Sequence, residues 1–269
     1  MANYAYPDGE DQLSREWFEG AGEDFKRYSE ASDRRVLEKM KGWLRSQPGG
    51  GEASLLDAGC GEGRLIPEFA ADFHRIAAVE PDASRLERAK TRARVAGLAD
   101  KVTFTHGTIE NLESSARFDV VLCSHVLQHV HTATVPTLLR RLREALVEGG
   151  QLILTTCHST TGQESFDQTL KRDGKLAVEP VSRERFDALI HNREAILPCR
   201  YFTEHALKAL LADAGFETRE VWLFHVDVQS FRELGGADDI DDRINADPSL
   251  RERMGVDVLI LARTRALLP

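Results

Sequence analysis

Short apolar runs alternate with longer amphipathic stretches along most of the chain. Each short run is almost continuously apolar, as expected for a strand covered on both faces of a sheet. Five runs are predicted as strands: Ser54–Gly59, Arg75–Glu80, Val102–Gly107, Phe118–Ser124 and Gly150–Cys157. Helical periodicity fills the intervals, most clearly over residues 82–98, where Asp82 or Ser84 is the expected N-cap. Gly97 is the expected stop. The alternation predicts strand–helix–strand units and a parallel sheet.

The rhythm changes after the fifth run. Residues 159–200 contain no clear strand, and their spaced apolar residues predict short helices in an insertion over the carboxyl edge of the sheet. A helix capped by Thr203 and two further strands, at 217–226 and 256–264, then restore the alternation. We expect an acidic, polar loop at 235–247 between these two strands.

The amino-terminal part has a different character from the rest of the chain. Residues 17–44 predict two amphipathic helices, and a glycine-rich hinge at 47–52 joins them to the first strand. We therefore expect a helical lid over residues 1–50 and one α/β domain over 51–269. Within that domain, residues 158–200 are expected to form a cap over the active site.

Composition limits the partners and the compartment. The 269 residues carry a formal net charge of -9, which disfavours a nucleic-acid partner because affinity for phosphate backbones is mostly cationic. No apolar run approaches the roughly 20 residues of a membrane helix, and the first residues lack the pattern of a signal peptide. We expect no membrane partner and a cytoplasmic protein.

The four cysteines are widely spaced. They form no pair separated by two residues, so their spacing predicts neither a zinc site nor a disulfide framework. We expect them to be reduced, small core residues.

The stretch Leu55–Leu65, LLDAGCGEGRL, carries the clearest chemical signal. A strand ends near Asp57 and turns through alternate glycines into a helix, which brings backbone amides and a helix amino terminus close to a ligand. Arg64 stands where a dinucleotide-binding loop has its third glycine, which disfavours a nicotinamide oxidoreductase. Glu80 closes the second strand, where a carboxylate can accept hydrogen bonds from both hydroxyls of a ribose. Together these features predict an adenosine-like ligand.

At this point the sequence resembles the class I S-adenosylmethionine-dependent methyltransferases. The resemblance covers Leu55–Cys157 well and Tyr201–Glu217 more loosely, with several motifs in order and at proper spacing. It implies S-adenosyl-L-methionine as cofactor and S-adenosyl-L-homocysteine as product. We expect a Rossmann-like α/β fold, with a seven-stranded, mostly parallel sheet flanked by helices, an antiparallel last strand and helical lid insertions.

The resemblance also assigns cofactor contacts residue by residue. Arg64 has two roles open to it, a forked pair with the cofactor carboxylate or a surface ion pair at the start of a helix. The family's aspartate for the adenine amino group is missing after the third strand, and Thr108 or Glu110 could replace it. The expected cofactor-binding residues are Asp57, Gly59 and Gly61 at the methionine side, Arg64, Glu80 at the ribose with Pro81 and Asp82 beside it, Thr108, Ile109 against the adenine, and Ser124 at the methionine part.

Histidines cluster where the family places its methyl acceptor. If the acceptor is a hydroxyl, a histidine is the usual group to take its proton. His125 and His158 are the predicted general bases, although each could equally be a polar residue that lines the pocket. His129 is expected to be structural. His125 and His129 are four apart, but no carboxylate or cysteine stands beside them at a supporting spacing, so no metal is predicted.

The expected function is methyl transfer to an oxygen, nitrogen or carbon atom of a small-molecule acceptor. Two alternatives remain open. One is a protein or peptide N-methyltransferase, and the other is a catalytically inert S-adenosylmethionine-binding protein, which the missing adenine-binding aspartate would favour. A nucleic-acid amino-methyltransferase is disfavoured because its proline-rich signature after the fourth strand is absent. Monomer and homodimer are both compatible with the sequence.

Overall fold

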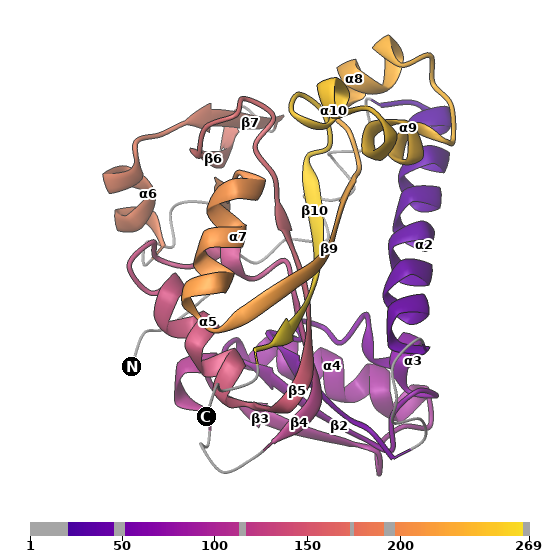
Figure 1. Cartoon of the computed structure of the whole chain (residues 1–269), viewed down its shortest axis with the longest axis vertical. Coiled ribbons are helices and arrows are strands. Elements are labelled where there is room, and N and C mark those ends of the chain that lie inside the picture. The colour runs from indigo at the N-terminus through magenta and orange to yellow at the C-terminus, as the bar shows by residue number, and fades with distance from the viewer. Residues whose placement is uncertain (1–20, 46–51, 113–116, 173–174, 191–196, 266–269) are drawn as a thin grey trace.

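A seven-stranded sheet forms the centre of the computed structural model, which describes residues 21–45, 52–112, 117–172, 175–190 and 197–265 (Figure 1). Its strands lie in the order β3-β2-β1-β4-β5-β10-β9. Their bounds are β1 (Ser54–Ala58), β2 (Arg75–Glu80), β3 (Val102–His106), β4 (Phe118–Ser124), β5 (Leu146–Cys157), β9 (Phe216–Phe224) and β10 (Asp257–Thr264). β10 pairs antiparallel with both β5 and β9, whereas the pairs from β3 to β5 are parallel. The predicted mostly parallel sheet with an antiparallel last strand is confirmed.

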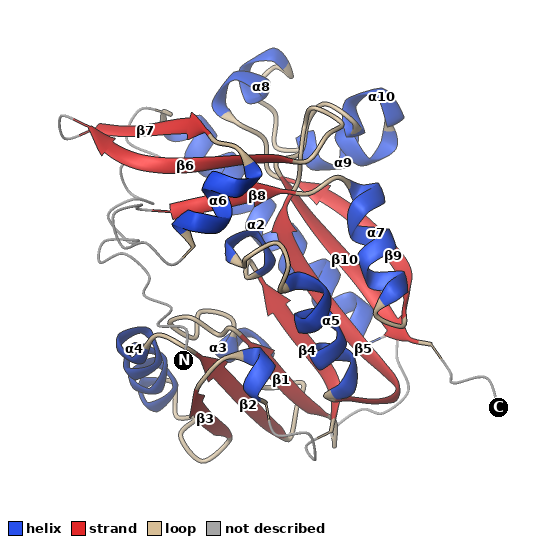
Figure 2. Cartoon of the chain, turned by 90° about the vertical axis from the view of Figure 1, so that its left-hand side faces the viewer, coloured by secondary structure: helices blue, strands red, loops and turns tan. Residues whose placement is uncertain are grey.

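Helices cover both faces of this sheet (Figure 2). One face packs against α3 (Ile66–Phe69) and α4 (Ala83–Val95), the other against α5 (Val135–Glu144) and α7 (Glu204–Asp213). Asp82 and Thr203 cap α4 and α7, because each side chain accepts a backbone N–H from the first turn. The predicted caps of these two helices are therefore confirmed.

The insertion after β5 is the main departure from expectation. In place of a set of short helices, the described residues of this insertion form a second sheet, β7-β6-β8, and one helix, α6 (Arg183–Leu189). Its strands are β6 (Ser165–Arg172), β7 (Lys175–Pro180) and β8 (Leu197–Tyr201). Phe166 and Leu170 misled the prediction because residues four apart share a face of a strand as well as of a helix. We call this sheet and α6 the cap; it lies beyond the carboxyl ends of β4 and β5 (Figure 2).

The acidic segment before β10 also differs from prediction. Part of it is helical: α9 (Ile240–Ala246) lies where a polar loop is expected, with α8 (Val228–Glu233) before that segment and α10 (Pro248–Arg251) after it. Ile240 and Ile244, one turn apart in α9, are both fully buried. These two contacts with the core explain why an otherwise acidic stretch folds as a helix.

A single helix, α2 (Glu23–Arg45), is described in the amino-terminal part, where two are predicted. It runs beside the sheet, and one end lies near α8 and α9 (Figure 1), where the Tyr28 hydroxyl donates to Asp241 Oδ1 at 2.7 Å. Residues 17–20 and most of the predicted hinge lie outside the described residues. No helix in the described part is long and apolar enough to cross a membrane.

Candidate active site

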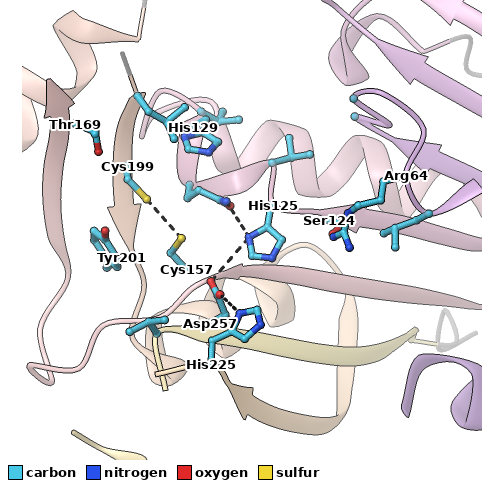
Figure 3. Close-up of a pocket in the computed structure, with 18 of the residues that line it drawn as sticks. Arg64, Ser124, His125, His129, Cys157, Thr169, Cys199, Tyr201, His225 and Asp257 are labelled. Atoms are coloured by element: carbon cyan, nitrogen blue, oxygen red, sulfur yellow. Dashed lines mark hydrogen bonds and ion pairs between the residues drawn. The ribbon is translucent and has the colours of Figure 1, made fainter. Parts of the chain in front are cut away.

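One cavity of about 1120 Å³ opens at the carboxyl ends of β1, β2, β4 and β5. It extends from the glycine loop after β1 to the cap and to the first residue of β10 (Figure 3). The carboxyl edge of an open parallel sheet is the usual place for a ligand in such folds. We divide the cavity into a loop half, lined by the glycine loop and Glu80, and a cap half, lined by residues of β5, β6, β8 and β10.

The glycine loop packs closely against the end of β2 and against Val126. The N–H groups of Gly59 and Cys60 both donate to the carbonyl of Val79, at 2.9 and 3.0 Å. Gly59 has a φ of 81°, and a Cβ there would lie 2.5 Å from Val126 Cγ2. Glycine is therefore required at this position both by conformation and by space.

Glu80 is held rigidly at the end of β2. Its Oε2 accepts the N–H of Gly61 and its Oε1 the N–H of Asp82, each at 2.9 Å, and only 3% of the residue is exposed. Burial raises the pKa of this carboxyl, against the two backbone hydrogen bonds and the charge of Arg85. The carboxylate lines the cavity, so its remaining acceptor capacity faces a ligand.

The loop half is electrically negative at its base. Burial and the neighbouring Glu80 raise the pKa of Asp57 to about 7, and the charge of Arg64 opposes that rise. A cation bound here would relieve the repulsion between the two carboxylates, while Arg64, which also lines the cavity, offers a partner for an anion.

Most of the remaining predicted cofactor residues line the same cavity. Asp82 does not: its carboxylate accepts the N–H of Arg85 at 2.9 Å and caps α4. Thr108 and Glu110, the two candidates for the adenine contact, both face the cavity. The predicted residues that line it are Asp57, Gly59, Gly61, Arg64, Glu80, Pro81, Thr108, Ile109 and Ser124.

His125 lies between the two halves, just after β4. It is a non-glycine residue with a φ of 53°, a conformation that costs energy and is often kept at functional sites. Its Nδ1 is 3.1 Å from Gln128 Nε2 and 3.9 Å from Asp257 Oδ1. Burial lowers the pKa of the imidazole although Asp257 opposes this, so the ring is neutral at pH 7 and can accept a proton.

His158 has a different environment. Its Nδ1 is 2.9 Å from the carbonyl of Gly255, it is 5% exposed, and it is not among the residues that line the cavity. The structure therefore brings only His125, of the two predicted bases, to the cavity.

His129, predicted to be structural, connects the sheet to the cap. It closes the short 3-10 helix η2 (Leu127–His129), and its Nδ1 is 2.8 Å from the carbonyl of Pro198 in β8. Burial lowers the pKa of its imidazole to about 4. The neutral ring can thus donate one hydrogen bond to the cap at neutral pH.

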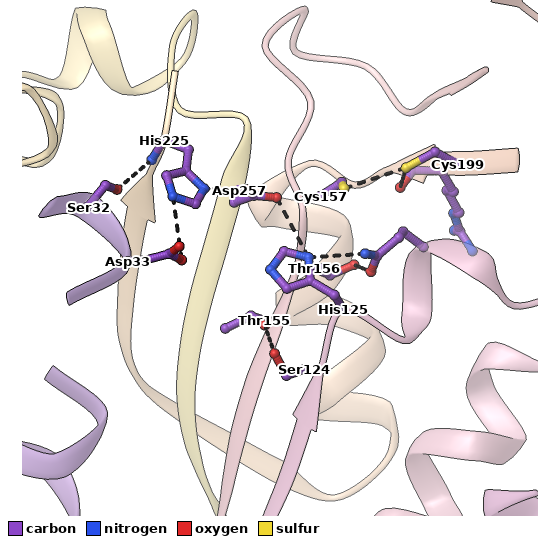
Figure 4. Close-up of polar contacts among 12 residues, drawn as sticks. Ser32, Asp33, Ser124, His125, Thr155, Thr156, Cys157, Cys199, His225 and Asp257 are labelled. Atoms are coloured by element: carbon purple, nitrogen blue, oxygen red, sulfur yellow. Dashed lines mark hydrogen bonds and ion pairs between the residues drawn. The ribbon is translucent and has the colours of Figure 1, made fainter. Parts of the chain in front are cut away.

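Two residues of the site lie outside the sequence predictions. Asp257 begins β10, and its Oδ2 is 2.9 Å from Nδ1 of His225, which itself has a φ of 54° (Figure 4). His125 and His225 are thus the two non-glycine residues with positive φ in the described chain, and both flank Asp257. Burial works against a charged imidazole, but the hydrogen bond and charge of Asp257 raise the pKa of His225 overall.

Two thiols face the cap half. The Sγ atoms of Cys157 and Cys199 are 3.5 Å apart, and both residues line the cavity beside Tyr201 (Figure 3). All four cysteines are free, as expected, but these two and Cys60 line the cavity and are not simple core residues. Nothing in the local sequence signals this, because the two cysteines are 42 residues apart and meet only when β8 packs beside the end of β5.

Comparison with known proteins shows the family to which the chain belongs. A family model described as a methyltransferase domain matches residues 25–221. The ubiquinone biosynthesis O-methyltransferase of Rickettsia felis is 33% identical over 106 residues, which are 39% of this chain and 42% of that protein. Its counterpart from Azorhizobium caulinodans is 31% identical over 191 residues, 70% of this chain and 64% of that protein. The matches thus span less than two thirds of either relative.

A solved structure extends the likeness of fold to nearly the whole chain. Magnesium protoporphyrin IX methyltransferase from Synechocystis PCC 6803, solved with bound SAH, aligns with a TM-score of 0.60 and 16% identity over 98% of this chain and 97% of that one. At this identity the alignment supports the fold alone, whereas the family model covers the glycine loop, Glu80 and His125. The chain therefore belongs to the methyltransferase-domain family.

Proposed function

We propose that this protein transfers the methyl group of S-adenosylmethionine to a small-molecule acceptor and releases S-adenosylhomocysteine. The observation that carries the proposal is the single cavity joining the glycine loop and Glu80 to His125 and the cap. A cofactor in the loop half and an acceptor in the cap half would meet beside His125.

The loop half suits the charges of the cofactor. The sulfonium and amino groups are cationic and would be stabilised near Asp57 and Glu80, whose repulsion they relieve. Arg64 offers a forked partner for the cofactor carboxylate. Glu80 would accept the ribose hydroxyls, and Ile109 would contact the adenine.

An oxygen acceptor is the form of the proposal that His125 favours. The acceptor oxygen would attack the methyl carbon, the carbon–sulfur bond would break, and the sulfonium would become a neutral thioether. The acceptor's proton would pass to Nδ1 of His125 in place of the Gln128 amide hydrogen bond at 3.1 Å, and Asp257 at 3.9 Å would stabilise the imidazolium. Curated relatives named as O-methyltransferases support the same acceptor atom.

The cap favours a small acceptor over a protein. Residues of β6 and β8, including Thr169 and Tyr201, line the end of the cavity away from the glycine loop, so an acceptor there would have to fit between these strands and the loop. We further propose a cytoplasmic location, as a monomer or a homodimer.

The test is transfer of isotopically labelled methyl from S-adenosylmethionine into an extract separated into small molecules and macromolecules. We expect label among the small molecules, and a loss of at least tenfold, about 1.4 kcal/mol, in His125→Gln at saturating cofactor. His74→Gln, at an exposed histidine outside the cavity, is the matched control. Label on macromolecules would contradict the proposed acceptor class, and equal rates in His125→Gln would contradict the proposed base.

A further inference from the structure

Three side chains of different chemistry converge at the cap half of the cavity. His125, Cys157 and Asp257 each offer one donor atom, and the three atoms lie within 4.8 Å of one another. The residues come from three separate places in the chain: the loop after β4, the end of β5 and the start of β10 (Figure 4). All three are half-buried, so an ion can reach them from the cavity.

The spacing of the donor atoms is close to that of a tetrahedral metal site. Bonds of about 2.0–2.3 Å from zinc to nitrogen, oxygen and sulfur place donor atoms about 3.3–3.8 Å apart. Nδ1 of His125 and Oδ1 of Asp257 are 3.9 Å apart, which small side-chain rotations would close. A tetrahedral ion held by three protein ligands keeps its fourth position open toward the cavity.

Neighbouring residues orient these donors, as second-shell partners do in metal sites. His225 engages Oδ2 of Asp257 at 2.9 Å and leaves Oδ1 turned toward His125. Asp33 in turn lies 3.7 Å from Nε2 of His225. The Sγ of Cys199, 3.5 Å from that of Cys157, adds a second sulfur beside the three donors.

The donor set selects among metals. A thiol, an imidazole and a carboxylate suit a borderline-soft divalent ion, whereas Mg²⁺ and Ca²⁺ prefer oxygen ligands alone. We propose that His125, Cys157 and Asp257 bind Zn²⁺ or a similar transition-metal ion. Binding displaces the thiol proton of Cys157 to solvent, so the ion is held by a thiolate, a neutral imidazole and a carboxylate.

One consequence rests on the proposed function. The ion would replace the Gln128 amide at the lone pair of His125 Nδ1, which is the proposed proton acceptor, and would occupy part of the cap half. Zinc is therefore expected to inhibit methyl transfer, and a chelator to restore it.

The first experiment is titration of the reduced, metal-free protein with Co²⁺. We expect one ion per chain, the visible bands of tetrahedral cobalt, and a thiolate-to-cobalt charge-transfer band in the near ultraviolet. Zn²⁺ should displace Co²⁺ stoichiometrically. The absence of stoichiometric binding, or binding without the charge-transfer band, would overturn the proposal.

Variants locate the site. Cys157→Ser should abolish the charge-transfer band. Changes to outer-shell partners of a metal typically weaken binding by about 10–100-fold, and Asp257→Asn, which removes a ligand, should weaken it at least as much. His225→Gln, which removes the partner of Asp257, should weaken binding within that same range. Cys123→Ala removes a buried core thiol outside the cavity and should bind cobalt as the unchanged protein does.

Folding of each variant is followed by circular dichroism, and the cobalt titration is interpreted only for variants with the native spectrum. Cys157→Ser and Asp257→Asn alter different strands, so a folding defect in one leaves the other as the test. Unchanged affinity in a folded variant of either kind would refute the assignment. Because cobalt binding needs no methyl acceptor, its outcome is independent of the proposed transferase activity.

Discussion

Replacing Glu80 by alanine tests the cofactor assignment most directly. The carboxylate is 3% exposed, faces the cavity and is fixed by the N–H groups of Gly61 and Asp82. The substitution removes both acceptor oxygens from the ribose. Water in the cavity can hydrate the two backbone N–H groups that it leaves, so the loop should keep its conformation.

The expected loss follows from the hydrogen bonds. A bond to a charged group contributes about 1.5–3 kcal/mol, so two ribose hydroxyls account for about 3–6 kcal/mol. Since about 1.4 kcal/mol is a factor of ten, affinity should fall by about 10²–10⁴-fold. The fold should lose little, because burial raises the pKa of Glu80 and its ionised form costs folding free energy at neutral pH.

The assay is calorimetric titration with S-adenosylhomocysteine, paired with a thermal melt of each variant. Glu87→Ala is the control, since this exposed α4 carboxylate pairs only with Lys90 among the contacts described and lies outside the cavity. A folded Glu80→Ala protein that binds within about threefold of the unchanged protein, less than 1 kcal/mol, would refute the ribose assignment.

Three further predictions concern the framework of the site. Gly59→Ala should lower the melting temperature and abolish S-adenosylhomocysteine binding, because its Cβ would lie 2.5 Å from a valine side chain. The control is Gly97→Ala, which has open space at a φ of 72° and should lower the free energy of unfolding by only about 1–2 kcal/mol, through its backbone conformation. The pKa of His129 is about 4 in the folded protein and 6.5 ordinarily, so as the pH drops the unfolded chain takes up this proton first. The free energy of unfolding should therefore fall by up to about 3 kcal/mol between pH 6.5 and pH 4. Urea unfolding of His129→Gln across this range should lack that part of the decrease. Tyr28→Phe leaves the fully buried Asp241 without its donor and should lower the free energy of unfolding in urea by about 1–3 kcal/mol.

The sheet and the loop half were predictable because their signals are local. Buried parallel strands are continuous apolar runs, and the glycine loop, Glu80 and the cap residue Asp82 each stand at a fixed place relative to a strand end. Asp82 shows the limit of that inference. Its position beside Glu80 predicts a cofactor contact, whereas its carboxylate is used by the first turn of α4.

The cap half was not predictable because its residues meet through long-range packing. Asp257 follows the glycine loop by about two hundred positions in the printed sequence, and its register against Cys157 is set by the pairing of β10 with β5. The strands of the cap carry few apolar residues, and the spacing of Phe166 and Leu170 fits either secondary structure. Positive φ at His125 and His225 leaves no trace in composition, because histidine is not a residue that such a backbone requires.

The position of β10 bears on how the protein matures during synthesis. It is the last strand of the sheet in sequence, yet it fills an interior place between β5 and β9. A ribosome delivers the glycine loop, Glu80 and His125 first, so a nascent chain can assemble a cofactor cleft while the wall bearing Asp257 is still untranslated. The nascent protein would then hold the cofactor before its acceptor site is complete, and insertion of β10 between β5 and β9 would make methyl transfer possible.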